Sequence, residues 1–173
     1  MRIEIVKGRD HDRIGVTRDD GSRAETTFPH KGPVPHDAVH WFVERELGLA
    51  SAFWGTVAGG LHPEAIQEIA KAAGHPSAKR AGLPEAGIIE LLQAERIVEC
   101  FEADLWGGGG AAADLIAIAD TACTASHVAL PAALDEVAVE RIRQGAGRLC
   151  ERVDRGAARA CRGADVGVRR WIR

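Results

Sequence analysis

Two histidines and two acids fall within nine residues of this chain, at a spacing that a helix would bring together. The run PHDAVHWFVE at 35–44 places His36 and His40 four residues apart, with Asp37 between them and Glu44 after them. Residues i and i+4 lie one above the other on an α-helix, so both imidazoles would point the same way. Two imidazoles at this spacing can bind one metal ion, as they do in H-E-x-x-H helices. Here Asp37 takes the Glu position of that motif, and this shorter acid would reach a bound water less easily.

A second group of acids is predicted on the longest helix, which we expect to begin at about residue 85 and to end at about residue 105. On that helix Glu95, Glu99 and Glu102 project within about 60° of one another. They run along the centre of an apolar stripe, whose other members are Leu91, Leu92, Val98 and Trp106. An unpaired buried carboxylate costs several kcal/mol, so these acids need a cationic partner. We expect the imidazole pair to face them.

The sequence supports three interpretations of these residues. In the first, the histidines and carboxylates form a structural cluster in a protein without catalytic activity. In the second, the cluster binds a divalent metal, with Zn²⁺ as the expected ion, and a carboxylate activates a bound water in a hydrolase-like reaction. The candidate metal ligands are then His36, His40, Glu44, Glu99 and His127, and the candidate catalytic acids are Asp37 and Glu44. In the third, the acidic stripe faces solvent or a partner subunit in a homo-oligomer.

The histidines are positioned by a helix that we predict over 35–47. Pro35 suits a first helical position because its missing N–H would have no helical partner there. Asp37 would meet the positive end of the helix dipole, and Gly48 supplies a C-terminal stop.

Alternating apolar residues predict three short strands before that helix, over 2–7, 13–18 and 23–28. The Asp-Gly pair at 20–21 is a hairpin signal.

Further helices are predicted after the helix at 35–47. They span 63–73 and 111–125 and continue from Asp135 onward, with a short helical segment between Ala50 and Ala58. The expected fold class is therefore α+β, with a small N-terminal three-stranded antiparallel sheet followed by a mainly helical body of five or six helices. Large aromatic residues are expected in its core, namely Trp41, Phe53, Trp54 and Trp106.

Composition narrows the class of protein. The 173 residues are 46% hydrophobic, which is enough for a core, and their formal net charge is −3. Such a charge creates no global field that would recruit nucleic acid or an anionic membrane. We expect no signal peptide and no apolar run close to the ~20 residues that span a bilayer. The four cysteines form no C-x-x-C pair, which is typical of reduced thiols in a cytoplasmic protein.

The composition changes after about Gln144. From 145 to 173 eight arginines face three acids, a net charge of +5, which leaves −8 for the preceding residues. We therefore expect a single α+β domain over 1–144 and a basic, Arg/Gly/Ala-rich tail over 145–173. The weak hydrophobic pattern of this tail fits a helix with a loose end, or a shifted reading frame in a GC-rich gene. Apart from Trp171 the tail lacks the interleaved aromatic residues of nucleic-acid-binding segments.

Three segments of the sequence resemble a known protein family. The segments KGPVPHDAVH (31–40), FWG (53–55) and QAER (93–96) are similar to a family of small bacterial proteins with a VPHDxxH motif, which are known mainly as uncharacterised or hypothetical proteins. The resemblance covers the acidic body up to the last amphipathic helix, and the residues after Gln144 do not look like that family's ending. It implies no activity, substrate or cofactor.

Overall fold

The computed structural model describes residues 1–29, 34–72, 84–154 and 166–170. Its strands are β1 (Arg2–Lys7), β2 (His11–Thr17), β3 (Arg23–Pro29) and β4 (Val166–Arg170). Its helices are α1 (His36–Leu47), α2 (Phe53–Ala58), α3 (Pro63–Ala72), α4 (Ile89–Gly107), α5 (Ala112–Ala125) and α6 (Glu136–Asp154), with the 3₁₀ turn η1 (Ala86–Ile88) before α4. The predicted α+β class is confirmed: three N-terminal antiparallel strands precede a mainly helical body.

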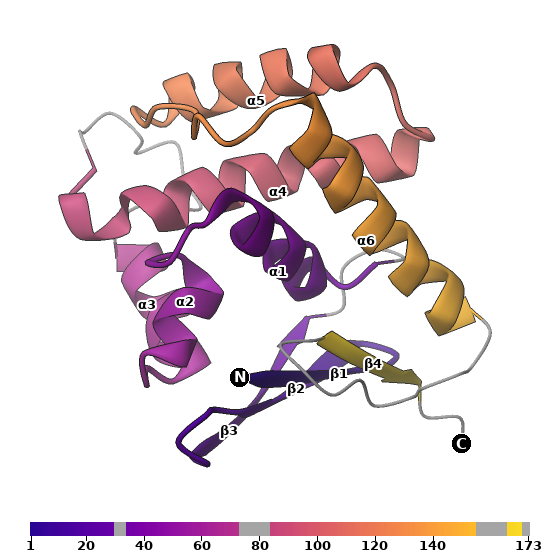
Figure 1. Ribbon diagram of the computed structural model, residues 1–173. Coiled ribbons are helices and arrows are strands. Elements are labelled where there is room, and N and C mark those ends of the chain that lie inside the picture. The colour runs from indigo at the N-terminus through magenta and orange to yellow at the C-terminus, as the bar shows by residue number, and fades with distance from the viewer. Residues whose placement is uncertain (30–33, 73–83, 155–165, 171–173) are drawn as a thin grey trace.

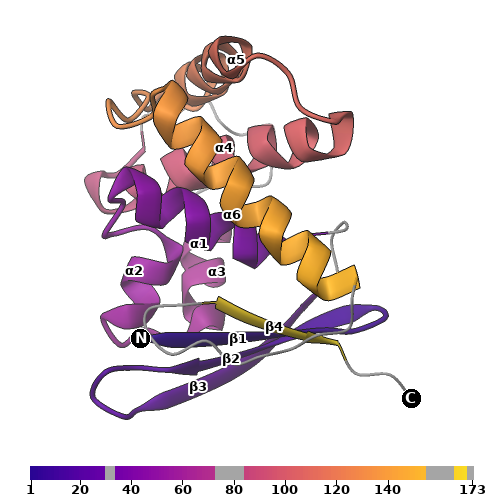
Figure 2. The same ribbon diagram turned by 45° about the vertical axis from the view of Figure 1, so that its right-hand side comes forward.

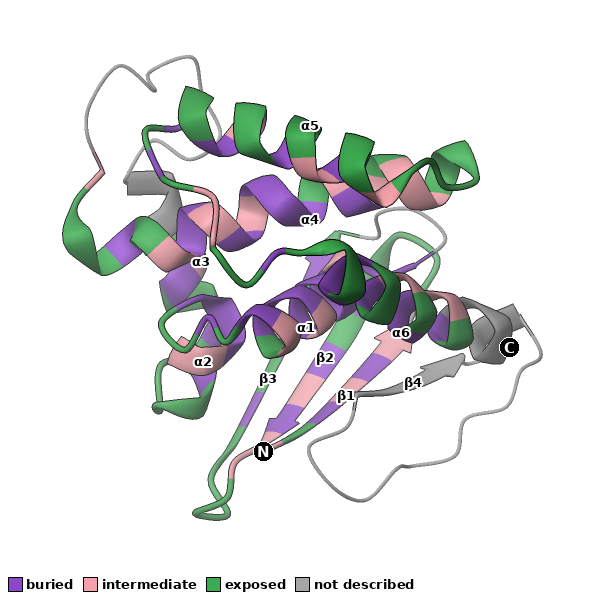
Figure 3. Cartoon of the chain, turned by 45° about the horizontal axis from the view of Figure 1, so that its top comes forward, coloured by how far each residue is buried: buried purple, intermediate pink, exposed green. Residues whose placement is uncertain are grey.

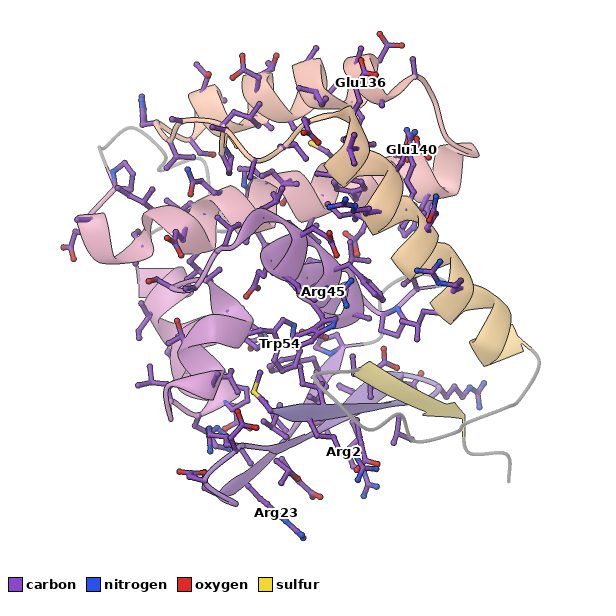
Figure 4. The ribbon with its side chains drawn as sticks, in the orientation of Figure 1. Arg2, Arg23, Arg45, Trp54, Glu136 and Glu140 are labelled. Atoms are coloured by element: carbon purple, nitrogen blue, oxygen red, sulfur yellow. The ribbon has the colours of Figure 1, made fainter. Side chains whose placement is uncertain are left out.

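The sheet presents one apolar face to the helices, as the period-2 pattern of its first two strands predicts. The β1–β2 hairpin aligns Ile5 with Ile14, and β3 pairs antiparallel with β2. The residues that this alternation buries on the inner face are Ile3, Ile5, Ile14, Val16, Ala24 and Phe28. Figure 3 shows the alternation of buried and exposed positions along the strands, and Figure 4 shows Arg2 and Arg23 extending away from the helices.

The sheet has a fourth strand, which the sequence pattern did not predict. The strand order is β3-β2-β1-β4, and β4 lies parallel to β1 with Val168 opposite Ile5. This strand belongs to the segment that we expected to be a basic tail. The chain after residue 144 therefore contributes to the same sheet as the N-terminus.

Helix α6 also continues through the predicted boundary at Gln144. Ile142, Ala146 and Leu149 are buried on its inner side, at the spacing of three and four residues that defines one helix face. Arg143 donates from Nε and Nη2 to the carboxylate of Asp104 on α4, at 2.8 and 2.7 Å. A single helix thus spans the change in composition.

The helices stack above the sheet in layers, with α1 on the sheet, α4 on α1 and α5 on the far side of α4 (Figure 1). Helices α2 and α3 lie at one side of α1, and α6 descends along the other side toward β4 (Figure 2). Trp41, Phe53 and Trp54 are buried in the core as expected. The expectation for Trp106 is wrong: it is 62% exposed, because it lies in the last turn of α4, directly before the glycines that end that helix.

Helix α1 ends where its sequence signals place it and begins one residue later than predicted, because Pro35 is its N-cap and not its first helical residue. These ends fix the direction of the two histidines. The carbonyl of Pro35 accepts the first helical N–H groups, from Ala38 and Val39. Gly48 adopts the left-handed conformation, with φ of 67°, and ends the helix. Both imidazoles consequently project from one side of α1, toward α4.

No helix within the described residues is long and apolar enough to cross a membrane.

Candidate metal centre

The two histidines of α1 meet two glutamates of α4 in a cluster between these helices. Nε2 of His40 lies 2.9 Å from Oε2 of Glu95, and Nε2 of His36 lies 3.7 Å from the other oxygen of the same carboxylate. The first distance is a hydrogen bond, whereas the second is an ion-pair contact beyond hydrogen-bond length. The two imidazole rings stand edge to face, with centroids 4.8 Å apart. Glu95 thus faces both histidines, with one carboxylate oxygen toward each.

A second carboxylate lies on the opposite edge of each imidazole. Nδ1 of His36 is 3.0 Å from Oε1 of Glu102, and Nδ1 of His40 is 3.1 Å from Oε1 of Glu44. Glu44 lies one turn after His40 on α1, and Glu102 lies two turns after the shared Glu95 on α4. Both nitrogens of both rings therefore face a carboxylate oxygen.

Glu44 is the most enclosed acid of the cluster, with a side chain only 4% exposed. Its second oxygen, Oε2, accepts the main-chain N–H of Trp54 at 2.7 Å and that of Gly55 at 3.4 Å. These two amides belong to the first turn of α2, whose N–H groups have no partner within the helix. The carboxylate thus connects His40 to α2.

Burial lowers the pKa of both histidines and the neighbouring carboxylates raise it, and the effect of the carboxylates is the larger one. Burial alone would lower the pKa of His40, but its hydrogen bonds to Glu44 and Glu95 and their negative charges raise that pKa to about 10. The pKa of His36 is also raised, because Glu102 and Glu95 more than offset its burial. Burial raises the pKa of Glu44 above its ordinary value. The cluster therefore favours a positive charge on the imidazole pair.

Three of these side chains could hold a metal ion. His36, His40 and Glu95 each offer one donor atom, and these atoms all lie within 4.8 Å of one another. It is the one such group of His, Cys, Asp or Glu within the described residues. Tetrahedral zinc with bonds of about 2.0–2.1 Å sets its ligand atoms roughly 3.4 Å apart. An ion would therefore lengthen the 2.9 Å contact between His40 and Glu95 and shorten the wider separations, which reach at most 4.8 Å. Two imidazole nitrogens and one carboxylate oxygen match the donor preference of zinc.

The other candidate residues occupy different positions. Glu99 is 46% exposed and forms an ion pair with Arg96 at 2.8 Å. His127 is exposed in the loop after α5, at a positive φ of 56°. Asp37 is buried in the first turn of α1, where its main-chain carbonyl accepts the indole N–H of Trp54 at 2.8 Å. The structure thus brings Glu44 to the histidine pair but does not bring Glu99 or His127 there.

Glu95 is a candidate metal ligand that the sequence pattern did not single out. The stripe pattern placed Glu95, Glu99 and Glu102 on the same face of α4 and gave no reason to select one of them. Their contacts separate them in the structure: Glu95 lies against His40 and Glu102 against His36, whereas Glu99 turns outward and pairs with Arg96. Two free thiols, Cys100 and Cys123, lie on α4 and α5, outside the donor group. Cys150 and Cys161 lie outside the side chains that the structure describes.

Comparisons with protein-family models, with curated proteins and with solved structures give no match for this chain.

Proposed function

We propose that this protein binds one divalent metal ion, with zinc as the favoured ion, through His36, His40 and Glu95. The observation that carries this proposal is that both nitrogens of each imidazole face carboxylate oxygens. A neutral imidazole has one N–H and one lone pair. When each ring donates its Nδ1–H to the outer carboxylate, both Nε2 lone pairs point toward Glu95. Three electron-pair donors then converge on one place, and a metal ion bound there would supply the positive charge that they need.

The residues around His36, His40 and Glu95 support metal binding over a chance cluster of polar side chains. Metal-binding histidines generally donate their second N–H to a carboxylate or a carbonyl, which fixes the ring and raises its basicity. Glu44 and Glu102 are placed to do this for His40 and His36 respectively. A metal site needs such an outer acid behind each histidine. An acidic helix face exposed to solvent has no need of one.

Three protein ligands leave the fourth position of a tetrahedral ion open. Zinc sites with two histidines and one glutamate hold a water there, and the ion lowers the pKa of that water to near neutrality. Glu95 and Glu102 are 15% and 18% exposed, so one side of the cluster reaches solvent. We therefore propose hydrolase-like chemistry at this ion, with an activated water as the nucleophile.

The second candidate is a structural cluster that binds no metal. It is favoured by the 2.9 Å separation of His40 and Glu95, which suits a protonated imidazole donating directly to the carboxylate. In this case imidazolium protons supply the positive charge, and the cluster only joins α1 to α4. The protein would then have no reactive centre at this place.

Metal content separates the two candidates. The purified, untagged protein is analysed for zinc and other divalent metals, alongside the variants His36→Ala and His40→Ala. Metal binding predicts about one ion per chain in the wild type and its loss in both variants, whereas Glu99→Gln, an acid on α4 outside the donor group, retains the ion. Metal-free wild-type protein whose thermal stability is unchanged by added Zn²⁺ would leave only the structural candidate.

A further inference from the structure

We infer that Glu44 is a positioning residue, which aims Nε2 of His40 at the metal and ties the metal to the first turn of α2. This inference rests on the proposed function, because it concerns the same site. It assigns Glu44 a role other than metal ligand or catalytic acid, although its spacing on α1 fits either of those.

Both oxygens of Glu44 are already engaged. Oε1 lies 3.1 Å from Nδ1 of His40, and Oε2 accepts the N–H groups of Trp54 and Gly55. Its side chain is 4% exposed, so water cannot replace these partners. A carboxylate held in this way keeps the proton of His40 on Nδ1 and leaves Nε2 as the only nitrogen of that ring able to bind the ion.

The charge of Glu44 matters as well as its shape. All three of its partners are donors when His40 binds metal through Nε2, and only a carboxylate accepts at both oxygens. In a glutamine variant the amide –NH₂ would oppose either the N–H of Trp54 or Nδ1–H of His40. One buried donor is then left without an acceptor, which costs about 1–3 kcal/mol.

Glu102 provides a matched comparison, because it contacts the other histidine but is more exposed to solvent and engages only one of its oxygens. It contacts Nδ1 of His36 with one oxygen, and its side chain is 18% exposed. A glutamine at this position can accept from Nδ1–H through its amide oxygen while its –NH₂ turns toward solvent. The two outer acids are therefore unequal, although each lies behind one histidine.

The contacts of α2 make Glu44 a link to a larger element. Arg18 donates to the carbonyl of Val57 in the last turn of α2 and to that of Leu61, which follows the helix, while Glu44 holds the first turn. Trp54, which lies between α1 and the sheet in Figure 4, also donates its indole N–H to the carbonyl of Asp37. An ion that fixes His40 would therefore also steady the amides of Trp54 and Gly55.

The test measures Zn²⁺ affinity by competition with a chromophoric chelator, for the wild type, Glu44→Gln and Glu102→Gln, with circular dichroism as the check on folding. We expect Glu44→Gln to bind Zn²⁺ about 10–100-fold more weakly than the wild type and Glu102→Gln to stay within a few-fold. Equal losses in the two variants, or no loss in Glu44→Gln, would overturn the positioning role. A wild type that binds no Zn²⁺ would instead refute the proposed function, and this inference with it.

A measurement on the wild type covers the case in which Glu44→Gln does not fold. Nitrogen-15 NMR of the Zn²⁺-loaded protein reports which imidazole nitrogen carries the proton. We expect a protonated Nδ1 and a metal-bound Nε2 for His40, and slower exchange of the Trp54 and Gly55 amides on adding Zn²⁺. Metal bound through Nδ1 of His40, or amide exchange that Zn²⁺ does not change, contradicts the inference.

Discussion

Glu95 on α4 holds both histidines of α1, with one carboxylate oxygen 2.9 Å from Nε2 of His40 and the other 3.7 Å from Nε2 of His36. His40 and Glu95 are 55 positions apart in the chain, so the contact exists only in the folded protein. The two interpretations differ in what neutralises the Glu95 carboxylate, which is a metal ion in one and protonated imidazole in the other. Each interpretation requires positive charge beside it, and they differ in what carries that charge.

Removing the charge of Glu95 should destabilise the metal-free protein whichever interpretation holds. In Glu95→Gln the buried His40 loses one of its two anionic partners and keeps only Glu44. Hydrogen bonds to charged groups contribute about 1.5–3 kcal/mol. We expect a loss of this order in the free energy of unfolding, measured by urea denaturation with a chelator present. The control is Glu99→Gln, at a half-exposed position where the amide oxygen can still accept from Arg96, and its cost should stay below about 1 kcal/mol. Equal losses in the two variants would show that Glu95 has no special role.

The stability of the metal-free protein should fall as the pH rises above 6.5. The pKa of His40 is raised from 6.5 to about 10 in the folded protein, so its stabilising contribution is fully present below 6.5 and is lost as the pH rises through 10. Between pH 6.5 and about 8, before unfolded-state thiols ionise extensively, we expect a decrease of roughly 1–2 kcal/mol in the free energy of unfolding. Denaturant titrations at several pH values measure it. His40→Gln should lack most of this slope, and a wild-type stability that is flat or rises over this range would contradict the assignment.

A pair of glycines in α6 tests whether that helix packs against α1 beyond residue 144. A Cβ at Gly145 would lie 2.5 Å from a ring carbon of Phe42 on α1, whereas a Cβ at Gly147 meets nothing within 4 Å. Gly147→Ala should therefore stabilise the protein by up to about 1 kcal/mol through helix propensity. Gly145→Ala should destabilise the protein, because the Phe42 ring must move. The steric cost is about 1–3 kcal/mol, and the gain in helix propensity offsets part of it. Thermal denaturation measures both, and a Gly145→Ala variant as stable as Gly147→Ala would show that this part of α6 does not dock.

The parts of the fold that follow from local sequence are those with strong periodic or terminal signals. Ile3, Ile5, Ile14 and Val16 alternate along two strands and are buried on one face. Helix α1 lies between Pro35 and Gly48 as its end signals require. The meeting of its histidines with acids of the long helix also follows from pattern, because a carboxylate on an apolar stripe needs a partner.

The remainder depends on contacts that local patterns do not encode. Strand β4 pairs with β1 from the opposite end of the chain, and its five residues carry a weak strand signal. The choice of Glu95 over Glu99 depends on how α1 is placed along α4, which a helical wheel does not give. The role that we assign to Glu44 depends on two main-chain amides of α2, so no side-chain pattern in the sequence could have indicated it.

The central claim is that His36, His40 and Glu95 together bind one divalent ion. Calorimetric titration of Zn²⁺ into protein stripped with a chelator tests it most directly. We expect saturation at about one ion per chain with release of protons, and no saturable binding in Glu95→Ala. Heats equal to those of dilution in the wild type, or an unchanged isotherm in Glu95→Ala, would contradict it.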